Sequence, residues 1–196
     1  MTAHTKILRC AIAVSFVATI ATLMLGFWIP VKAELAQILL ERAWTEVRSG
    51  RVATRPWPWA DTSPIARLAI PELGVSWIVL AGASGRNLAF APSHMDGSAM
   101  PGDIGVAMIS GHRDTHFAVL EQLGVGAKLV VETADGATYS YQVTTTQIVD
   151  STHARIRLDS SERLLVLTTC YPFDAVTAGG PLRFIVEAKS LTDTDT

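Results

Sequence analysis

The sequence has few charges, and none of them gather into a run. Of the 196 residues 17% are charged and the formal net charge is −2, with no stretch rich in lysine and arginine. Such a chain has little with which to neutralise the phosphates of DNA or RNA, so nucleic acid is not expected as a partner. The carboxylates Glu72, Asp96, Asp103 and Glu121 are scattered rather than clustered. We therefore expect no bound metal and no cofactor.

Long apolar runs are also scarce, with one exception near the N-terminus. Residues 11–29 carry no charge, and as a helix they would rise about 28 Å, close to the thickness of a bilayer's hydrocarbon core. Lys6 and Arg9 precede this run, and positive charge on that side favours a cytoplasmic N-terminus and an exported body. We expect a single-pass anchor in the cytoplasmic (inner) membrane, with lipid as the partner of residues 11–29. A signal peptide cleaved after Ala33 is the alternative.

Cysteine is nearly absent. Cys10 would lie at the cytoplasmic edge of the anchor and Cys170 in the exported body, so the two cannot form an intramolecular disulfide. A lone thiol in an oxidising compartment is a liability, which suggests a functional reason for it. Cys170 ends the apolar run R-L-L-V-L-T-T-C-Y-P-F (163–173), which is typical of a buried strand. An inert core cysteine is the alternative, since free cysteine packs like a small apolar side chain.

The chain divides into four parts. Residues 1–30 are expected to form the cytoplasmic stub and the anchor. Residues 31–64 begin with apolar residues at helical spacing up to Gly50, which predicts a juxtamembrane helix acting mainly as a spacer. They end in a linker rich in proline and tryptophan. Its two tryptophans could dock on the body or lie at the membrane surface, and we expect docking. Residues 65–190 form the body, and residues 191–196 a disordered tail.

The body has mostly the pattern of strands. Short apolar or alternating segments recur between glycine, proline and aspartate, and A-D-G at 134–136 is typical of a hairpin turn. Seven or eight strands with a few short helices, expected at 84–90 and 115–123, predict an all-β fold, a closed or nearly closed barrel. The predicted strands cover residues 66–70, 75–81, 104–110, 128–132, 138–149, 163–169 and 183–188.

A nucleophilic cysteine needs partners, because an ordinary thiol is mostly neutral at pH 7. It needs a base or a cation, and a donor for the oxyanion of a tetrahedral intermediate. His112 ends the apolar strand I-G-V-A-M-I-S-G-H, where a rigid strand can aim an imidazole. Arg183 starts the strand that follows Cys170. If these two strands are antiparallel neighbours, the sulfur and the guanidinium fall at the same rim of the barrel.

Three nearby residues have more than one interpretation. His116 could share a metal with His112, but no third ligand is apparent, so we expect it in a loop near the cleft. His94 either lines the substrate groove or is simply exposed to solvent. Both are kept as candidate substrate-binding residues. Asp114 either orients His112 or caps the helix at 115–123, and the cap is the preferred interpretation.

Three stretches resemble the signature segments of the sortases, which are cysteine transpeptidases anchored outside the cytoplasmic membrane. They are S-G-H-R-D-T-H-F (110–117), L-T-T-C-Y-P-F (167–173) and G-G-P-L-R-F (179–184), in the same order and preceded by M-P-G-D-I-G. The likeness spans roughly residues 65–188. The sequences of the first two motifs, together with the single N-terminal anchor, most resemble those of the proteobacterial sortase group. One departure is Gly180, where many relatives carry alanine or serine before the proline.

The resemblance implies a sortase-like closed eight-stranded β-barrel and assigns roles to residues. It makes Cys170 the nucleophile, His112 the general acid and base, and Arg183 the residue that binds the oxyanion or positions the substrate. Thr169, directly before the nucleophile, is a further candidate for positioning the substrate.

The activity implied by the resemblance is acyl transfer. The thiolate would cleave a sorting signal near the C-terminus of a secreted protein, and an amine in the cell envelope would resolve the resulting thioester. The expected partners are thus a secreted substrate protein with that signal and an envelope amine. A cysteine peptidase, in which water resolves the thioester, is one alternative. A non-catalytic, membrane-tethered β-domain that binds peptides is the other.

Overall fold

A computed structural model describes residues 9, 12, 13, 15, 16, 19, 35–51, 54–175 and 179–191. The chain forms two compact units, Met1–Ile38 and Leu39–Thr196. The predicted anchor, residues 11–29, lies largely outside the described residues. Among the residues that are described, none belongs to a helix long and apolar enough to cross a membrane.

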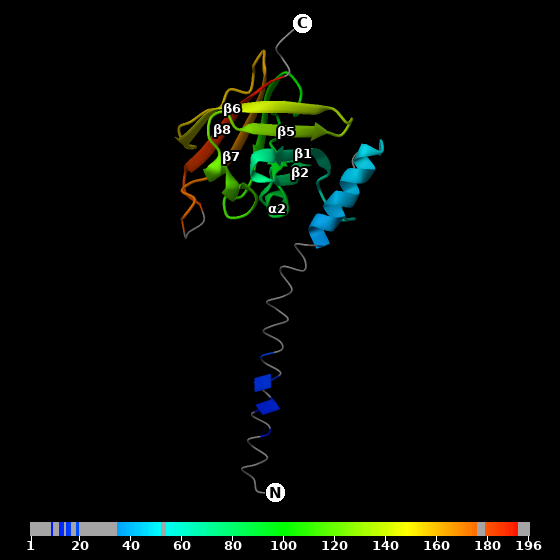
Figure 1. Cartoon of the computed structure of the whole chain (residues 1–196). Helices are drawn as coiled ribbons and strands as arrows, with labels where there is room; N and C mark the ends of the chain where they lie inside the picture. The colour runs from blue at the N-terminus through cyan, green and yellow to red at the C-terminus, as the bar shows by residue number, and fades with distance from the viewer. Residues whose placement is uncertain are drawn as a thin grey trace. The chain divides into compact units, whose positions relative to one another are not determined.

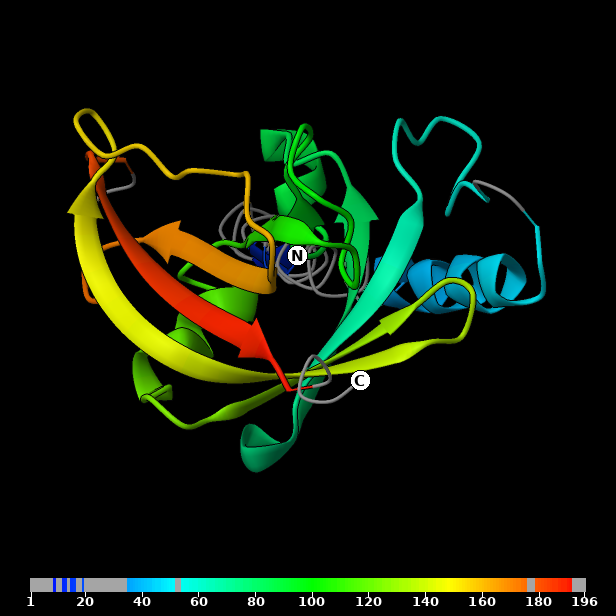
Figure 2. The same cartoon turned by 90° about the horizontal axis from the view of Figure 1, so that it is seen from above.

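The second unit is built on a closed barrel of the eight strands that the structure describes (Figures 1 and 2). Around the barrel their order is β1-β2-β3-β4-β7-β8-β6-β5, and β5 pairs with β1 to close it. The pairs β2–β3 and β4–β7 are parallel and the others are antiparallel. The closed eight-stranded barrel is therefore confirmed. The strands are β1 (Pro64–Ile70), β2 (Val75–Ala81), β3 (Ser93–His94), β4 (Gly105–Ser110), β5 (Lys128–Thr133), β6 (Thr138–Asp150), β7 (Arg163–Cys170) and β8 (Leu182–Ser190).

The helices of this unit are short. They are η1 (Pro71–Leu73), α2 (Gly85–Leu88), η2 (His116–Gln122) and the part from residue 39 onward of a helix over 35–48. α2 begins where Ser84 Oγ accepts a hydrogen bond from the backbone N–H of Asn87, an N-terminal cap. Gly50 lies two residues past the end of the helix over 35–48, and its φ of 93° is the left-handed conformation expected after a helix C-terminus.

Each strand supplies one set of side chains to the barrel interior and another to the outer face, because successive side chains point in opposite directions. On β7, Leu165 and Leu167 lie in the interior core, whereas Leu164 and Val166 belong to a separate cluster. We call this separate group the outer cluster. Its remaining members are Met95, Val106, Met108, Val149, Ile156, Leu158 and Ile185.

The helical residues from 39 onward pack on the barrel rather than forming a free spacer. Leu40 and Trp44 are buried in a cluster with Ile78 and Leu80 of β2. Ion pairs flank this contact: Arg67 of β1 binds the carboxylate of Glu41 through two hydrogen bonds of 3.1 and 2.6 Å, and Arg48 pairs with Glu132 of β5. The helix is thus held by an apolar stripe with charges on either side.

The linker docks through one of its two tryptophans. The ring of Trp57 meets the ring of Phe90 edge to face, with centroids 4.9 Å apart. Trp59 instead remains 79% exposed. The expectation that both tryptophans dock is therefore confirmed for Trp57 and wrong for Trp59.

Candidate active site

Three strand ends meet at one rim of the barrel. Cys170, the last residue of β7, lies directly opposite Arg183 of the antiparallel strand β8 (orange and red in Figure 2). β4 runs parallel to β7 on its other side, with Ser110 opposite Thr168. The backbone N–H of Gly111 donates to the carbonyl oxygen of Thr168 at 3.1 Å, so the ladder continues past the end of β4. His112, the next residue, therefore reaches the level of Cys170.

The alternation of the strands indicates which way these side chains face. On β7, Cys170 follows Leu164 and Val166 at even spacing, so it shares their outer face. On β8, Arg183 is two residues before Ile185, a member of the outer cluster. The thiol and the guanidinium therefore share the outer face, at the end of an apolar surface.

Solvent can reach this part of the rim. Cys170 is a free, half-buried cysteine, Arg183 is half-buried and His112 is exposed. Nη1 of Arg183 donates to the carbonyl oxygens of Gly180 and Leu182 at 2.7 and 2.8 Å, which fixes the start of β8. A partly exposed thiol at a strand end disfavours the inert core cysteine, because such a residue would be enclosed among apolar side chains.

Thr169 lies on the opposite face of β7 from the thiol. It is buried, and its hydroxyl donates to the carbonyl oxygen of Gly111 at 2.7 Å. This bond ties β7 to the residue before His112. The role predicted for Thr169 in positioning the substrate stays a prediction, and the contact seen here is to the protein's own backbone. Thr168 is the threonine on the outer face.

The backbone before His112 is packed tightly against the next turn of the chain. A Cβ atom added at Gly111 would lie 2.6 Å from the ring of Phe117. Phe117 is fully buried, and its N–H donates to the carbonyl oxygen of His112 at 3.0 Å. The loop that carries His112 is thereby folded back onto the interior core.

His116 is the first residue of η2, so the expectation that it lies in a loop is wrong. Its substrate-binding role stays a prediction. Burial lowers the pKa of His116, and the positive charge on His112 lowers it further. Its ring approaches that of Trp77 edge-on, and Nδ1 is 3.2 Å from Thr115 Oγ1. In the described part of the chain, no three His, Cys, Asp or Glu side chains are grouped so that they could hold a metal.

His94 is buried, so its interpretation as a solvent-exposed residue is wrong. Its ring nitrogen Nε2 is 2.8 Å from the carbonyl oxygen of Ala99 and 2.9 Å from Ser98 Oγ, both in the loop that follows β3. The substrate-binding role of His94 stays a prediction. Its observed partners hold the loop between β3 and β4 in place.

The residues after His112 hold the feature that sequence reasoning missed. Arg113 is buried, and it donates hydrogen bonds to the carbonyl oxygens of Pro172 and Ala175, just beyond Cys170. The preferred interpretation of Asp114 as the cap of η2 is wrong, because its carboxylate instead accepts a hydrogen bond from Nε of Arg113 at 3.2 Å. η2 begins after Thr115, whose side chain makes no capping bond. In the sequence, the only indication of this contact is that a charged residue, Arg113, directly follows His112.

A groove of about 400 Å³ lies on the same outer face of the barrel as the thiol. Val106 of β4, Val166 of β7 and Ile185 of β8 form its apolar floor, and residues 154–157 of the β6–β7 loop form a wall that includes two arginines. Its strand surface continues along β7 and β8 to Cys170 and Arg183. The arrangement suits an extended chain lying across the strands, with the thiol of Cys170 at one end.

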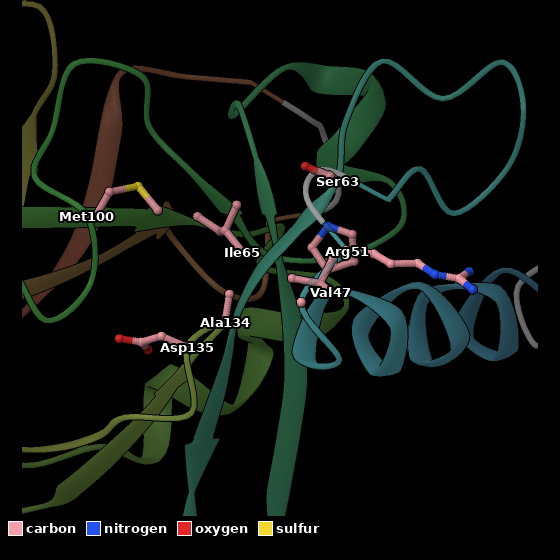
Figure 3. A pocket seen from close by; sticks show the side chains of 9 residues that line it. Val47, Arg51, Ser63, Ile65, Met100, Ala134 and Asp135 are labelled. Carbon is pink, nitrogen blue, oxygen red and sulfur yellow. The ribbon is translucent and has the colours of Figure 1, made fainter.

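A second cavity, of about 410 Å³, lies at the other rim. Val47, Ile65, Met100 and Ala134 supply apolar parts of its lining, as Figure 3 shows. It opens at the start of β1, which the strand pairings make parallel in direction to β7. Because Cys170 ends β7, this cavity is at the opposite rim and is no part of the candidate site.

Comparison with known proteins identifies sortases as relatives of this chain. The family model described as "Sortase domain" matches residues 68–191, a span that includes His112, Cys170 and Arg183. Sortase D of Bacillus subtilis (strain 168) is 32% identical over 126 residues, which cover 64% of this chain and 63% of that protein. The match thus spans less than two thirds of this curated relative.

Solved structures resemble the barrel as well. A sortase D5 transpeptidase of Clostridium perfringens superposes with a TM-score of 0.65 at 20% identity, covering 81% of this chain and 99% of that one. Sortase A of Corynebacterium diphtheriae gives a TM-score of 0.61 at 22% identity, covering 85% and 88%. At these identities the likeness shows the fold alone.

Proposed function

Since the chain belongs to the sortase family, we propose that it is a membrane-anchored transpeptidase that works through Cys170. The observation that carries this proposal is the pairing of Cys170 with Arg183 across β7 and β8, with His112 brought to the same level by β4. A nucleophile, a proton carrier and a cationic donor then meet at one open rim beside an apolar groove.

In the proposed reaction the Cys170 thiolate attacks a peptide carbonyl of a sorting signal in a secreted protein. Arg183 donates hydrogen bonds to the oxyanion that forms, and His112 gives a proton to the leaving amine. The acyl group remains on sulfur as a thioester. An amine of the cell envelope then attacks the thioester while His112 takes up its proton, and the sulfur leaves as the thiolate, which restores the starting pair. The groove on the outer face would hold the signal in an extended form.

The location of the enzyme is part of the proposal. Residues 11–29 would anchor it in the cytoplasmic membrane, with the N-terminus in the cytoplasm and the barrel outside. The charge-free apolar run and the preceding Lys6 and Arg9 support this. Membership of the proteobacterial sortase group is also proposed, because the sequences at 110–117 and 167–173 resemble the motifs of that group.

A mass-spectrometric assay on the full chain in detergent tests the reaction. The enzyme is incubated with a pooled library of random-sequence peptides, with and without triglycine as the amine. A transpeptidase yields peptides shortened at their C-terminus and extended by triglycine, together with an acyl-enzyme mass on the peptide that contains Cys170. Cys170→Ala serves as the control and should give neither species.

The other outcomes separate the alternatives. Products that end in a free carboxyl even when triglycine is abundant would identify a peptidase on the same site. If peptides bind but the wild-type chain gives the same masses as Cys170→Ala, the proposal fails and the peptide-binding domain is favoured.

A further inference from the structure

The buried arginine beside His112 is costly to the fold unless its donors are paired. Arg113 is only 4% exposed, and a guanidinium moved away from water must recover its hydrogen bonds within the protein. Its backbone belongs to the loop that leaves β4, directly after the proposed acid and base. The side chain is turned inward at a point where His112 and Asp114, on either side of it, are exposed.

The partners of Arg113 lie in the segment that carries the chain away from Cys170. Nη1 donates to the carbonyl oxygen of Pro172 and Nη2 to that of Ala175, each at 2.9 Å. The two nitrogens of one planar group thus hold two backbone oxygens of a single turn. Arginine is suited to this, because its donors form a rigid fork that lysine lacks.

Asp114 completes the arrangement from the solvent side. It is 66% exposed, and its carboxylate accepts a hydrogen bond from Nε of Arg113 at 3.2 Å. The pair is therefore partly screened by water, and its main effect is to fix the plane of the guanidinium.

We propose that Arg113 is a positioning residue that joins the loop of His112 to the turn after Cys170 and so fixes the imidazole relative to the sulfur. Two hydrogen bonds already tie the strands below the rim, Gly111 N–H to Thr168 and Thr169 hydroxyl to Gly111. Arg113 adds hydrogen bonds between the loop after His112 and the turn after Cys170, so the two segments are connected both within the strands and beyond their ends. The role in catalysis rests on the proposed function, whereas the coupling between the two loops does not.

The test compares Arg113→Lys and Asp114→Ala with the wild type and with Arg86→Lys, a matched control in α2 whose side chain is 75% exposed and lies outside the groove. Lysine keeps the charge but cannot hold both carbonyl oxygens. Because small misplacements of reacting groups are expensive, we expect Arg113→Lys to lower kcat by about 10- to 100-fold with little change in KM. Asp114→Ala should act in the same direction by a smaller factor, and Arg86→Lys should leave kcat unchanged.

A second readout needs no peptide substrate. Iodoacetamide alkylation of Cys170 is followed in the full chain in detergent by the mass of its tryptic peptide, which separates it from Cys10. A double-mutant cycle then compares His112→Ala in the wild-type and Arg113→Lys backgrounds. If Arg113 positions the pair, His112→Ala changes the alkylation rate in the wild type and changes it much less once Arg113 is lysine.

The outcomes are distinct. Equal effects of His112→Ala in both backgrounds, or an unchanged kcat in a folded Arg113→Lys, overturn the inference. If Arg113→Lys does not fold, Asp114→Ala decides by the same cycle, and a full His112 effect there overturns it. A wild-type chain that shows the coupling but no acyl transfer would contradict the proposed function and leave the positioning role standing.

Discussion

At the scale of single residues, Gly111 shows how closely the site is packed. An alanine there would place its Cβ 2.6 Å from the ring of Phe117, which is enclosed in the core and cannot swing aside. We expect Gly111→Ala to destabilise the protein by about 1–3 kcal/mol, as overpacking does, and to lower activity by moving His112. Urea unfolding measures the first effect. Gly124→Ala is the control, since nothing lies within 4 Å of its added Cβ. Equal losses in the two variants would contradict the packing argument.

His116 should make stability depend on pH. Its pKa is lowered in the folded protein by burial and by the charge on His112, from an ordinary value of 6.5. At high pH the residue is neutral in both states and contributes no pH dependence. Below about pH 6.5 the unfolded chain takes up the proton first, so stability falls as pH drops through the window down to the folded pKa.

The expected result is that His116→Gln flattens the dependence of unfolding free energy on pH between 7.5 and 5. Urea unfolding across this range measures it. A slope that survives in His116→Gln would assign the effect to another group.

Some residues of the candidate site can be predicted from the sequence next to them, whereas others depend on partners far away in the chain. Cys170, His112 and Arg183 stand at the ends of apolar runs, so their strands alone predict a shared rim. The inward direction of Thr169 also follows from the alternation of β7. Arg113 could not be found this way, because its partners are 59 and 62 residues away in the chain. Burial of a charge by distant backbone oxygens leaves no local pattern.

At the scale of elements, periodicity located the long strands and missed what tertiary pairing creates. β2 has the predicted bounds, and β5, β6 and β7 differ from theirs by one residue at the C-terminal end. β3 has only two residues, too few to show any alternation. It exists because Ser93 and His94 fall between β2 and β4, where the barrel needs a bridge to close.

The helical residues from 39 onward allow a test of what holds an element to the barrel. Trp44 is 4% exposed and packs on β2, so we expect Trp44→Ala to cost about 3–5 kcal/mol in unfolding free energy. Glu41→Ala breaks only the ion pair with Arg67, which is open to water, and should cost about 0–1 kcal/mol. Urea unfolding of the full chain in detergent compares them. If the ion pair outweighs the tryptophan, electrostatics rather than burial fixes the helix.

At the scale of the whole molecule, the two rims of the barrel have different properties. One carries the thiol, the guanidinium and a groove that runs along the outer face, and the other holds an apolar cavity beside the end of the helix over 35–48. Each strand that the structure describes has a neighbour on both sides, and β3 bridges only the last two residues of β2 to β4. The strands can therefore serve as a rigid frame, and the loops at the thiol rim decide the geometry of the site.

The proposed topology of the whole chain can be tested with its own two cysteines. If residues 11–29 cross the membrane with the N-terminus inside, Cys10 faces the cytoplasm and Cys170 the outside. A sulfonated maleimide, which cannot cross a bilayer, should then label Cys170 in intact spheroplasts and reach Cys10 only after lysis. Cys10→Ser and Cys170→Ser assign each label, and the chain should stay with the membrane through an alkaline carbonate wash. Labelling of Cys10 before lysis would reverse the topology. A mature chain that begins after Ala33 and lacks Cys10 would replace the anchor with a cleaved signal peptide.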